Sequence, residues 1–176
     1  MKILHLHDSG GLYGAEMVIL NLVAEQLNMG LEVEIASIGE RHIKEKPFET
    51  EALKRRLPIV KFRMFPGPNL LGMLKVLRYA RQKRFDILHS HGYKGDVAFG
   101  IIPRRRRRLS LVSTLHGWTS VNGISKNAVY EWLQRKSLKH MDAAVVVNKA
   151  MLSNPRLSNL SHVNFLLPLC ILRDCY

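Results

Sequence analysis

The sequence has 176 residues, of which 47% are hydrophobic; this suits one substantial core and is short for two, so we expect a single domain. Most of its net charge of +13 lies in residues 54–108, which carry sixteen lysines and arginines against two aspartates and should attract phosphate, anionic lipid or nucleic acid. The only two cysteines, Cys170 and Cys175, lie near the end and do not suggest a disulfide framework. The early His-Leu-His-Asp segment argues against a signal peptide, and the longest apolar run, eight residues, is too short to span a membrane. We therefore expect a cytoplasmic protein.

The first half of the chain alternates between strand and helix patterns. An apolar strand over residues 3–6 leads through a glycine segment, residues 8–14, into an amphipathic helix over 15–29. Gly30 should end that helix in the left-handed conformation. Alternating apolar and charged residues predict two strands, and a polar stretch between them predicts a loop with a short helix. The predicted strands are 31–35 and 59–64, and Lys61 and Arg63 of the second should face outward. The polar stretch between them is 42–57.

The second half continues the same alternation. A helix over residues 69–83 should bury Leu70, Leu74 and Leu77 and present a basic opposite face. Apolar runs predict further strands at 86–90, 111–115, 143–147 and 162–166, with helical segments at 93–102 and 124–140. Strands that alternate with helices imply right-handed crossovers. We therefore predict an α/β fold, a doubly wound and mostly parallel sheet with helices on both faces.

In such a sheet, ligands bind beyond the carboxyl ends of the strands. At the first of these ends, Gly10 and Gly11 would let a phosphate approach backbone N–H groups at the positive end of the following helix. The same glycines also suit a simple tight turn. Their spacing with Gly14 is not Gly-x-Gly-x-x-Gly, and no acidic residue clearly ends the second strand, so a dehydrogenase is not expected.

Two more strand ends carry histidines. His89 and His91 share one face, with His91 nearer the mouth, where it could bond a sugar hydroxyl or simply a neighbouring carbonyl. His116 and its neighbour Gly117 follow the next strand along the chain. Tyr13 and Trp118 could offer flat faces to a sugar ring or close the edge of the core. We expect these loops to line one cleft.

Four segments together, in their order and spacing, resemble the amino-terminal half of family 4 glycosyltransferases. They are Gly10 to Glu16, Asp86 to Gly92, Thr114 to Gly117 and Asp142 to Asn148. The resemblance implies a Rossmann-like half of a GT-B fold, with residues 1–152 as the acceptor-side domain. Residues 153–176 would be a divergent tail of a truncated chain that lacks the donor-binding domain.

The same resemblance implies retaining, metal-independent transfer of a sugar from a nucleotide-sugar to a glycan or lipid-linked acceptor, with no cofactor and no activity of this half alone. It makes His91 the catalytic residue, in contact with the donor sugar. The substrate-binding residues it implies are Gly10, Gly11, Tyr13, Gly14, His116 and Gly117.

Other functions fit parts of the sequence. One is a non-catalytic basic module that binds a membrane or nucleic acid; its membrane-facing residues would be Lys75, Arg78, Arg81 and Lys83. A transferase with a lipid-linked acceptor could use the same face on the inner surface of a membrane. Residues 104–108 are expected to form a solvated loop, and nucleic acid is not the expected partner because no aromatic residues interleave the basic run. A metallohydrolase using His5, His7, His89 and His91 would lack a supporting carboxylate cluster.

Overall fold

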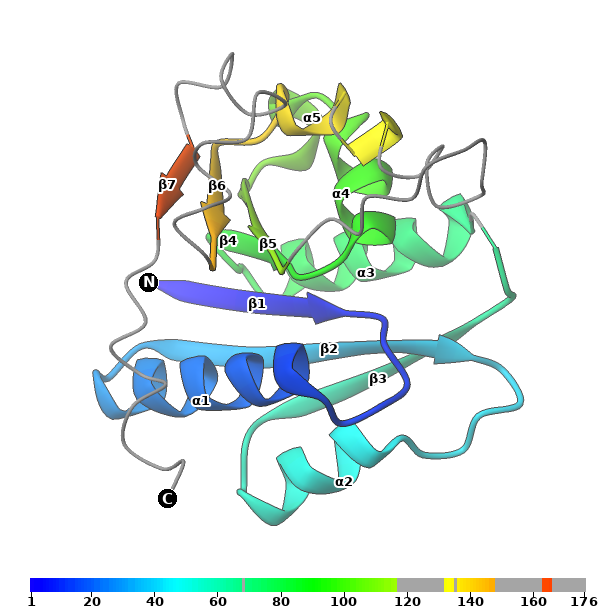
Figure 1. The fold of residues 1–176 in the computed structure, drawn as a ribbon. Helices are drawn as coiled ribbons and strands as arrows, with labels where there is room; N and C mark the ends of the chain where they lie inside the picture. The colour runs from blue at the N-terminus through cyan, green and yellow to red at the C-terminus, as the bar shows by residue number, and fades with distance from the viewer. Residues whose placement is uncertain (68, 117–131, 135, 148–162, 166–176) are drawn as a thin grey trace.

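The centre of the structure is a parallel sheet. The computed structural model describes residues 1–67, 69–116, 132–134, 136–147 and 163–165, and within them seven strands pair in the order β3-β2-β1-β4-β5-β6-β7 (Figure 1). The strands are β1 (Lys2–His7), β2 (Glu32–Glu40), β3 (Ile59–Met64), β4 (Ile87–Ser90), β5 (Ser110–Leu115), β6 (Ala143–Val146) and β7 (Val163–Phe165). The chain builds outward from β1 in one direction, then returns to place β4 on its other side. This reversal is the switch point at which doubly wound sheets bind ligands.

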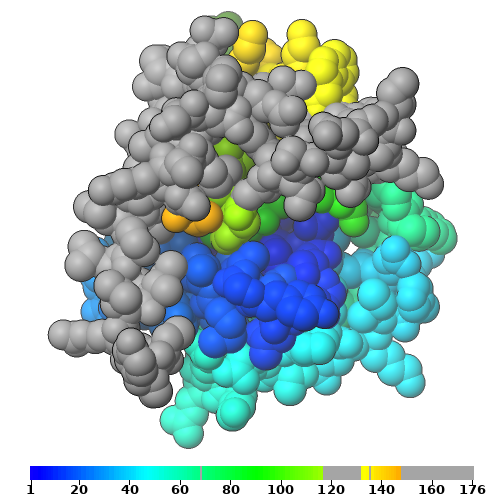
Figure 2. All heavy atoms as spheres, in the orientation of Figure 1, coloured from blue at the N-terminus to red at the C-terminus, as the bar shows by residue number. Residues whose placement is uncertain are grey.

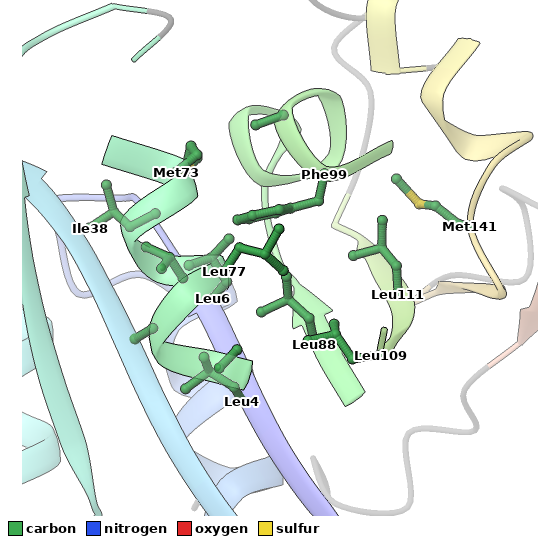
Figure 3. Close-up of a cluster of buried hydrophobic side chains, with 14 of the residues drawn as sticks. Leu4, Leu6, Ile38, Met73, Leu77, Leu88, Phe99, Leu109, Leu111 and Met141 are labelled. Carbon is green, nitrogen blue, oxygen red and sulfur yellow. The ribbon is translucent and has the colours of Figure 1, made fainter. Parts of the chain in front are cut away.

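Helices cover both faces of the sheet, as predicted (Figure 1). They are α1 (Gly14–Asn28), α2 (Pro47–Lys54), α3 (Leu70–Gln82), α4 (Tyr93–Gly100) and α5 (Arg104–Arg107). Because side chains alternate along a strand, β1 serves two cores. Leu4 and Leu6 pack with α3 and α4 (Figure 3), whereas Ile3 packs with α1 and α2.

Most predicted elements are confirmed, including Gly30, whose φ of +77° ends α1 in the left-handed region. β2 is longer than predicted and reaches Glu40. The alternation of apolar and charged residues covers only its first half, because residues 36–39 are buried on both faces. Of the predicted helix over 124–140, the described residues 132–134 and 136–138 are helical.

The buried face of α3 differs from the prediction. Leu77 is buried, but Leu70 and Leu74 are 54% and 48% exposed. The helix instead turns Gly72, Met73, Val76, Leu77 and Ala80 inward. Gly72 allows this orientation, since a Cβ there would lie 2.7 Å from the Met64 sulfur.

The arginine run is not a solvated loop throughout. Residues 104–107 form α5, and Arg107 is fully buried. Its guanidinium donates hydrogen bonds to the carbonyl oxygens of Phe99, Ile102 and His140 and to Asp142 Oδ2, the last at 3.1 Å. Asp142 also accepts a hydrogen bond from the Leu111 backbone at 2.8 Å. The run therefore joins α4, β5 and the residues before β6.

Replacing Arg107 with alanine should lower the free energy of unfolding by about 3 kcal/mol, because it leaves buried carbonyls and Asp142 without their donor. Arg106→Ala, one residue away on the exposed side of α5, should change it by less than about 0.5 kcal/mol. Urea unfolding of both variants measures the difference. Equal losses would show that Arg107 has no special structural role.

Candidate functional site

Five of the eight histidines gather where β1, β4 and β5 end. His5 and His7 lie on β1, His89 on β4, and His91 and His116 just beyond β4 and β5. The parallel register places His5 opposite His89. His5 and His7 continue the face of Ile3, so the cluster lies on the side of the sheet that α1 covers.

Hydrogen bonds join these rings into a chain. His5 Nε2 lies 2.7 Å from Gln26 Oε1 on α1, and His5 Nδ1 lies 2.9 Å from His91 Nε2. His91 Nδ1 lies 3.4 Å from His116 Nε2. Because the Gln26 oxygen only accepts, His5 carries its proton on Nε2 and His91 donates to His5. His116 then donates to His91.

Four rings of the cluster, those of His5, His89, His91 and His116, are neutral at pH 7. Burial lowers the pKa of His5 and of His116 to about 4, and it holds the pKa values of His89 and His91 well below the usual range. His89 stacks on His91 with ring centroids 4.3 Å apart, and its Nε2 lies 2.7 Å from Thr114 Oγ1. At this edge the histidines can therefore offer hydrogen bonds and lone pairs, but not positive charge.

A buried carboxylate fixes the start of α1. Glu16 Oε1 lies 3.0 Å from His7 Nε2, and Glu16 Oε2 accepts a hydrogen bond from the Tyr13 backbone at 2.9 Å. Burial alone would raise the pKa of Glu16, but hydrogen bonds from Ser9, His7 and the backbone outweigh it and lower that pKa to about 2. Glu16 was not among the predicted site residues, although it closes the glycine motif that was.

The glycine segment follows His7 of this cluster and is partly or fully exposed. The amino-terminal part of the chain, blue in Figure 2, reaches the surface of the molecule. A Cβ added at Gly10 or Gly14 would meet no atom within 4 Å, whereas one at Gly11 would clash with the Tyr13 ring. Tyr13 is 74% exposed, so it does not close the core and is open to a ligand. Gly117, Trp118, Cys170 and Cys175 lie outside the described residues.

Cations hold the glycine segment in place, and the sequence did not reveal them. Lys46 is buried and donates hydrogen bonds to the carbonyl oxygens of Ser9, at 2.8 Å, and Ile38. Lys94, on the first turn of α4, pairs with Asp8 at 3.2 Å. No sequence pattern predicts these two contacts, because both lysines are far from the glycine segment in the sequence and approach it only in the folded structure.

A second buried carboxylate lies behind Lys46. Glu49 accepts hydrogen bonds from the Ser37 hydroxyl at 2.6 Å and from Arg63 at 2.7 Å. Arg63 was predicted to face outward with Lys61; this is wrong, because its side chain is only 19% exposed and turns toward Glu49. Lys61 is the more exposed of the two, at 35%.

Asp96 connects α4 to β5. It is fully buried, and its Oδ2 accepts hydrogen bonds from Ser113 at 2.8 Å and from Gln134 at 2.6 Å. Burial raises the pKa of this carboxyl to about 6. The group that ties the helix after β4 to the next strand therefore titrates close to neutral pH.

The family model for glycosyltransferase family 4 matches residues 12–154, which is most of the sequence. The chain belongs to glycosyltransferase family 4. No curated protein matches the sequence.

Solved structures share the fold of this family 4 chain at low sequence identity. HepE from Anabaena, in complex with UDP, has a TM-score of 0.74 and 19% identity over 94% of this chain and 43% of HepE. The lipopolysaccharide outer core galactosyltransferase WaaB has a TM-score of 0.64 and 14% identity, covering 93% of this chain and 44% of WaaB. UDP-GlcNAc 2-epimerase from Methanocaldococcus jannaschii has a TM-score of 0.62 and 9% identity over 94% of this chain and 45% of the epimerase. The chain thus spans less than half of each protein and fits the amino-terminal half of a GT-B fold.

The Asp96→Asn variant of this family 4 chain should change how stability depends on pH. The folded-state pKa of about 6 lies above the ordinary 3.8, so wild type binds more protons when folded and loses stability as the pH rises from about 4 to about 6. This loss is at most about 3 kcal/mol, and the variant should escape it. Urea unfolding between pH 4 and pH 8 measures both proteins, and parallel pH profiles would contradict the assignment.

Proposed function

We propose that this chain is the acceptor-side half of a retaining, metal-independent glycosyltransferase that moves a sugar from a nucleotide-sugar to a glycan or lipid-linked acceptor. One observation carries the proposal: the exposed glycine segment and the neutral histidine cluster meet at the edge where β1, β4 and β5 end. Membership of family 4 supports it. Residues 1–176 should have no activity by themselves, because they span less than half of each solved transferase that they resemble.

The glycine segment is suited to phosphate. Gly10 and Gly14 leave their surroundings open, and the backbone N–H groups there lie at the positive end of α1. Stabilising the departing diphosphate is the electrostatic step that lowers the barrier in such a transfer. We assign part of that role to this segment and the larger part to the second half of the enzyme.

The histidines are suited to sugar hydroxyl groups. Both ring nitrogens of His91 lie against other rings of the cluster, and the residue is 4% exposed. His116 lies at the outer end of the chain of rings and is only partly buried. We therefore give His116 the contact with the sugar and His91 the task of orienting it. Gln26 sets the direction of donation along the chain of rings, so that the His116 proton is on Nε2. His116 therefore presents its Nδ1 lone pair as an acceptor for a hydroxyl.

The exposed part of α3 is suited to an anionic membrane surface. Leu70, Leu71 and Leu74 are 54%, 76% and 48% exposed. The four predicted membrane-facing residues, Lys75, Arg78, Arg81 and Lys83, are exposed as well. No helix in the described part of the chain is long and apolar enough to cross a membrane. We propose that α3 lies on the surface of the bilayer and brings a lipid-linked acceptor to the site.

A small pocket lies beside this face of α3. It has a volume of about 60 Å³ and lies between α3 and α4, with Leu70, Met73 and Lys94 among its lining residues. Lys94 is the residue that pairs with Asp8 at the end of β1. An acceptor held at the membrane by α3 would therefore meet a cation next to the glycine segment.

Titration of UDP, GDP and their sugars into this chain tests the half-enzyme proposal. We expect dissociation constants above about 1 mM for residues 1–176, because we assign the groups that hold the nucleotide mainly to the other half of such a fold. Isothermal titration calorimetry measures the binding. Tight binding that discriminates between sugars would overturn the proposal.

Sedimentation with vesicles that contain anionic lipid tests the membrane face. The double variant Lys75→Ser with Arg78→Ser should weaken binding about 30-fold, since each cation near an anionic leaflet contributes about 1 kcal/mol. The matched control, Arg105→Ser with Arg106→Ser, removes two exposed cations from α5 and should bind as wild type does. Equal losses in the two variants would show unspecific attraction, and displacement by an oligonucleotide would favour nucleic acid instead.

A further inference from the structure

Three histidines of the cluster are also arranged so that they could share a metal ion. His5, His89 and His91 are all buried, and each can offer one nitrogen such that the three nitrogens lie within 4.8 Å of one another. We propose that these three residues bind a divalent transition-metal ion, with Zn²⁺ as the best fit. The ion would tie β1 to β4 behind the substrate edge.

The spacing of the rings fits a shared ion. His5 Nδ1 and His91 Nε2 lie 2.9 Å apart. Two nitrogen ligands at about 2.0–2.1 Å from a tetrahedral zinc ion are roughly 3.3 Å apart, so this pair would have to separate by only a few tenths of an ångström. The three nitrogens lie within 4.8 Å of one another, so the widest pair would have to close by about 1.5 Å or less, through rotation of the rings. The hydrogen bond between His5 and His91 would then be replaced by two metal bonds. Imidazole nitrogen is a ligand that zinc favours.

On each ring, the nitrogen that would not bind the ion has a hydrogen-bond partner, as expected for a metal ligand. Histidines that bind metals almost always use their second nitrogen to hydrogen-bond an outer group, which fixes the ring. Here that outer group is Gln26 Oε1 for His5 and Thr114 Oγ1 for His89, each at 2.7 Å. For His91 it is His116, at 3.4 Å. These contacts leave His5 Nδ1, His89 Nδ1 and His91 Nε2 for the ion.

His7 and Glu16 add a fourth nitrogen and a negative charge. His7 is 4% exposed, and its Nδ1 is buried without a hydrogen-bond partner among the described residues. Its other nitrogen, Nε2, lies 3.0 Å from the Glu16 carboxylate. A carboxylate behind a histidine is a common outer partner of bound zinc, and its charge offsets part of the cost of burying a dication. His7 follows His5 on the same face of β1, so we assign it the fourth position.

The presence of histidines in the interior of the sheet also needs an explanation, and hydrogen bonding alone does not give one. Strands buried on both faces in parallel sheets are normally continuous runs of apolar residues. The face of β1 toward α1 begins with Ile3 and then carries His5 and His7, opposite His89 on β4. Filling this interior with imidazoles sacrifices apolar burial and leaves His7 Nδ1 unpaired, whereas a bound ion would use these groups.

The test is a titration of the chain, first stripped of metal by a chelator, with Zn²⁺ by calorimetry and with Co²⁺ by visible absorption. We expect one equivalent of each ion to bind and the Co²⁺ complex to show the spectrum of a nitrogen-ligated ion. His89→Ala should abolish this binding. His42→Ala and His140→Ala, which remove exposed histidines, should leave it unchanged. Zn²⁺ should also raise the Tm of wild type but not of His89→Ala.

A second variant keeps the test decisive if His89→Ala fails to fold. Thr114→Val conserves shape and touches no ligand atom, but it removes the outer partner of His89 and should weaken Zn²⁺ binding 10- to 100-fold. Zn²⁺ binding that is equal in wild type, His89→Ala and Thr114→Val, or absent from all three, would overturn the proposal. Neither result would bear on the transferase proposal, which is tested by the nucleotide titration and does not need the ion.

Discussion

The parallel pairing of β1 with β4, and of β4 with β5, is the constraint on which the site depends. Backbone hydrogen bonds in this register place His5 opposite His89 and Ser90 opposite Ser113, so that both β4 and β5 end beside the glycine segment. A slip of one residue would turn each of these side chains to the other face. The two apolar cores, one on each face of β1, oppose that slip because it would carry His5 and His7 into the apolar core that holds Leu4 and Leu6.

Buried charge is the second organising feature of this strongly basic chain. Arg107 with Asp142 and Arg63 with Glu49 each connect different elements of the fold, and Glu16 near the start of α1 contacts His7 at the end of β1. A buried ionic group is costly unless it is paired and hydrogen bonded, so these contacts define which segments must meet. The positive charge at the edge of the site is likewise held by specific partners, as Lys94 is by Asp8.

Local pattern was enough to predict the strands, the glycine segment and the loops that form the site, because periodicity and glycine placement act over a few residues. It failed where a distant contact decides the outcome. Leu70 and Leu74 have the right spacing for burial, but the close approach of Gly72 to Met64 turns them outward. Arg107 is buried by carbonyl groups that the arginine run does not contain, and the contact of His5 with His91 joins residues 86 positions apart.

The edge strand β3 shows how this sheet ends. A strand with one unpaired side can recruit a strand from another molecule, and natural edges are commonly blunted by charge and proline. β3 carries Lys61 and Arg63, follows Pro58 and is followed by Pro66. Lys61 Nζ lies 3.2 Å from Glu45 Oε1, so a charged pair lies beside this edge strand. Self-association of the protein through strand addition at β3 is therefore disfavoured, even at the high concentrations that biophysical work requires.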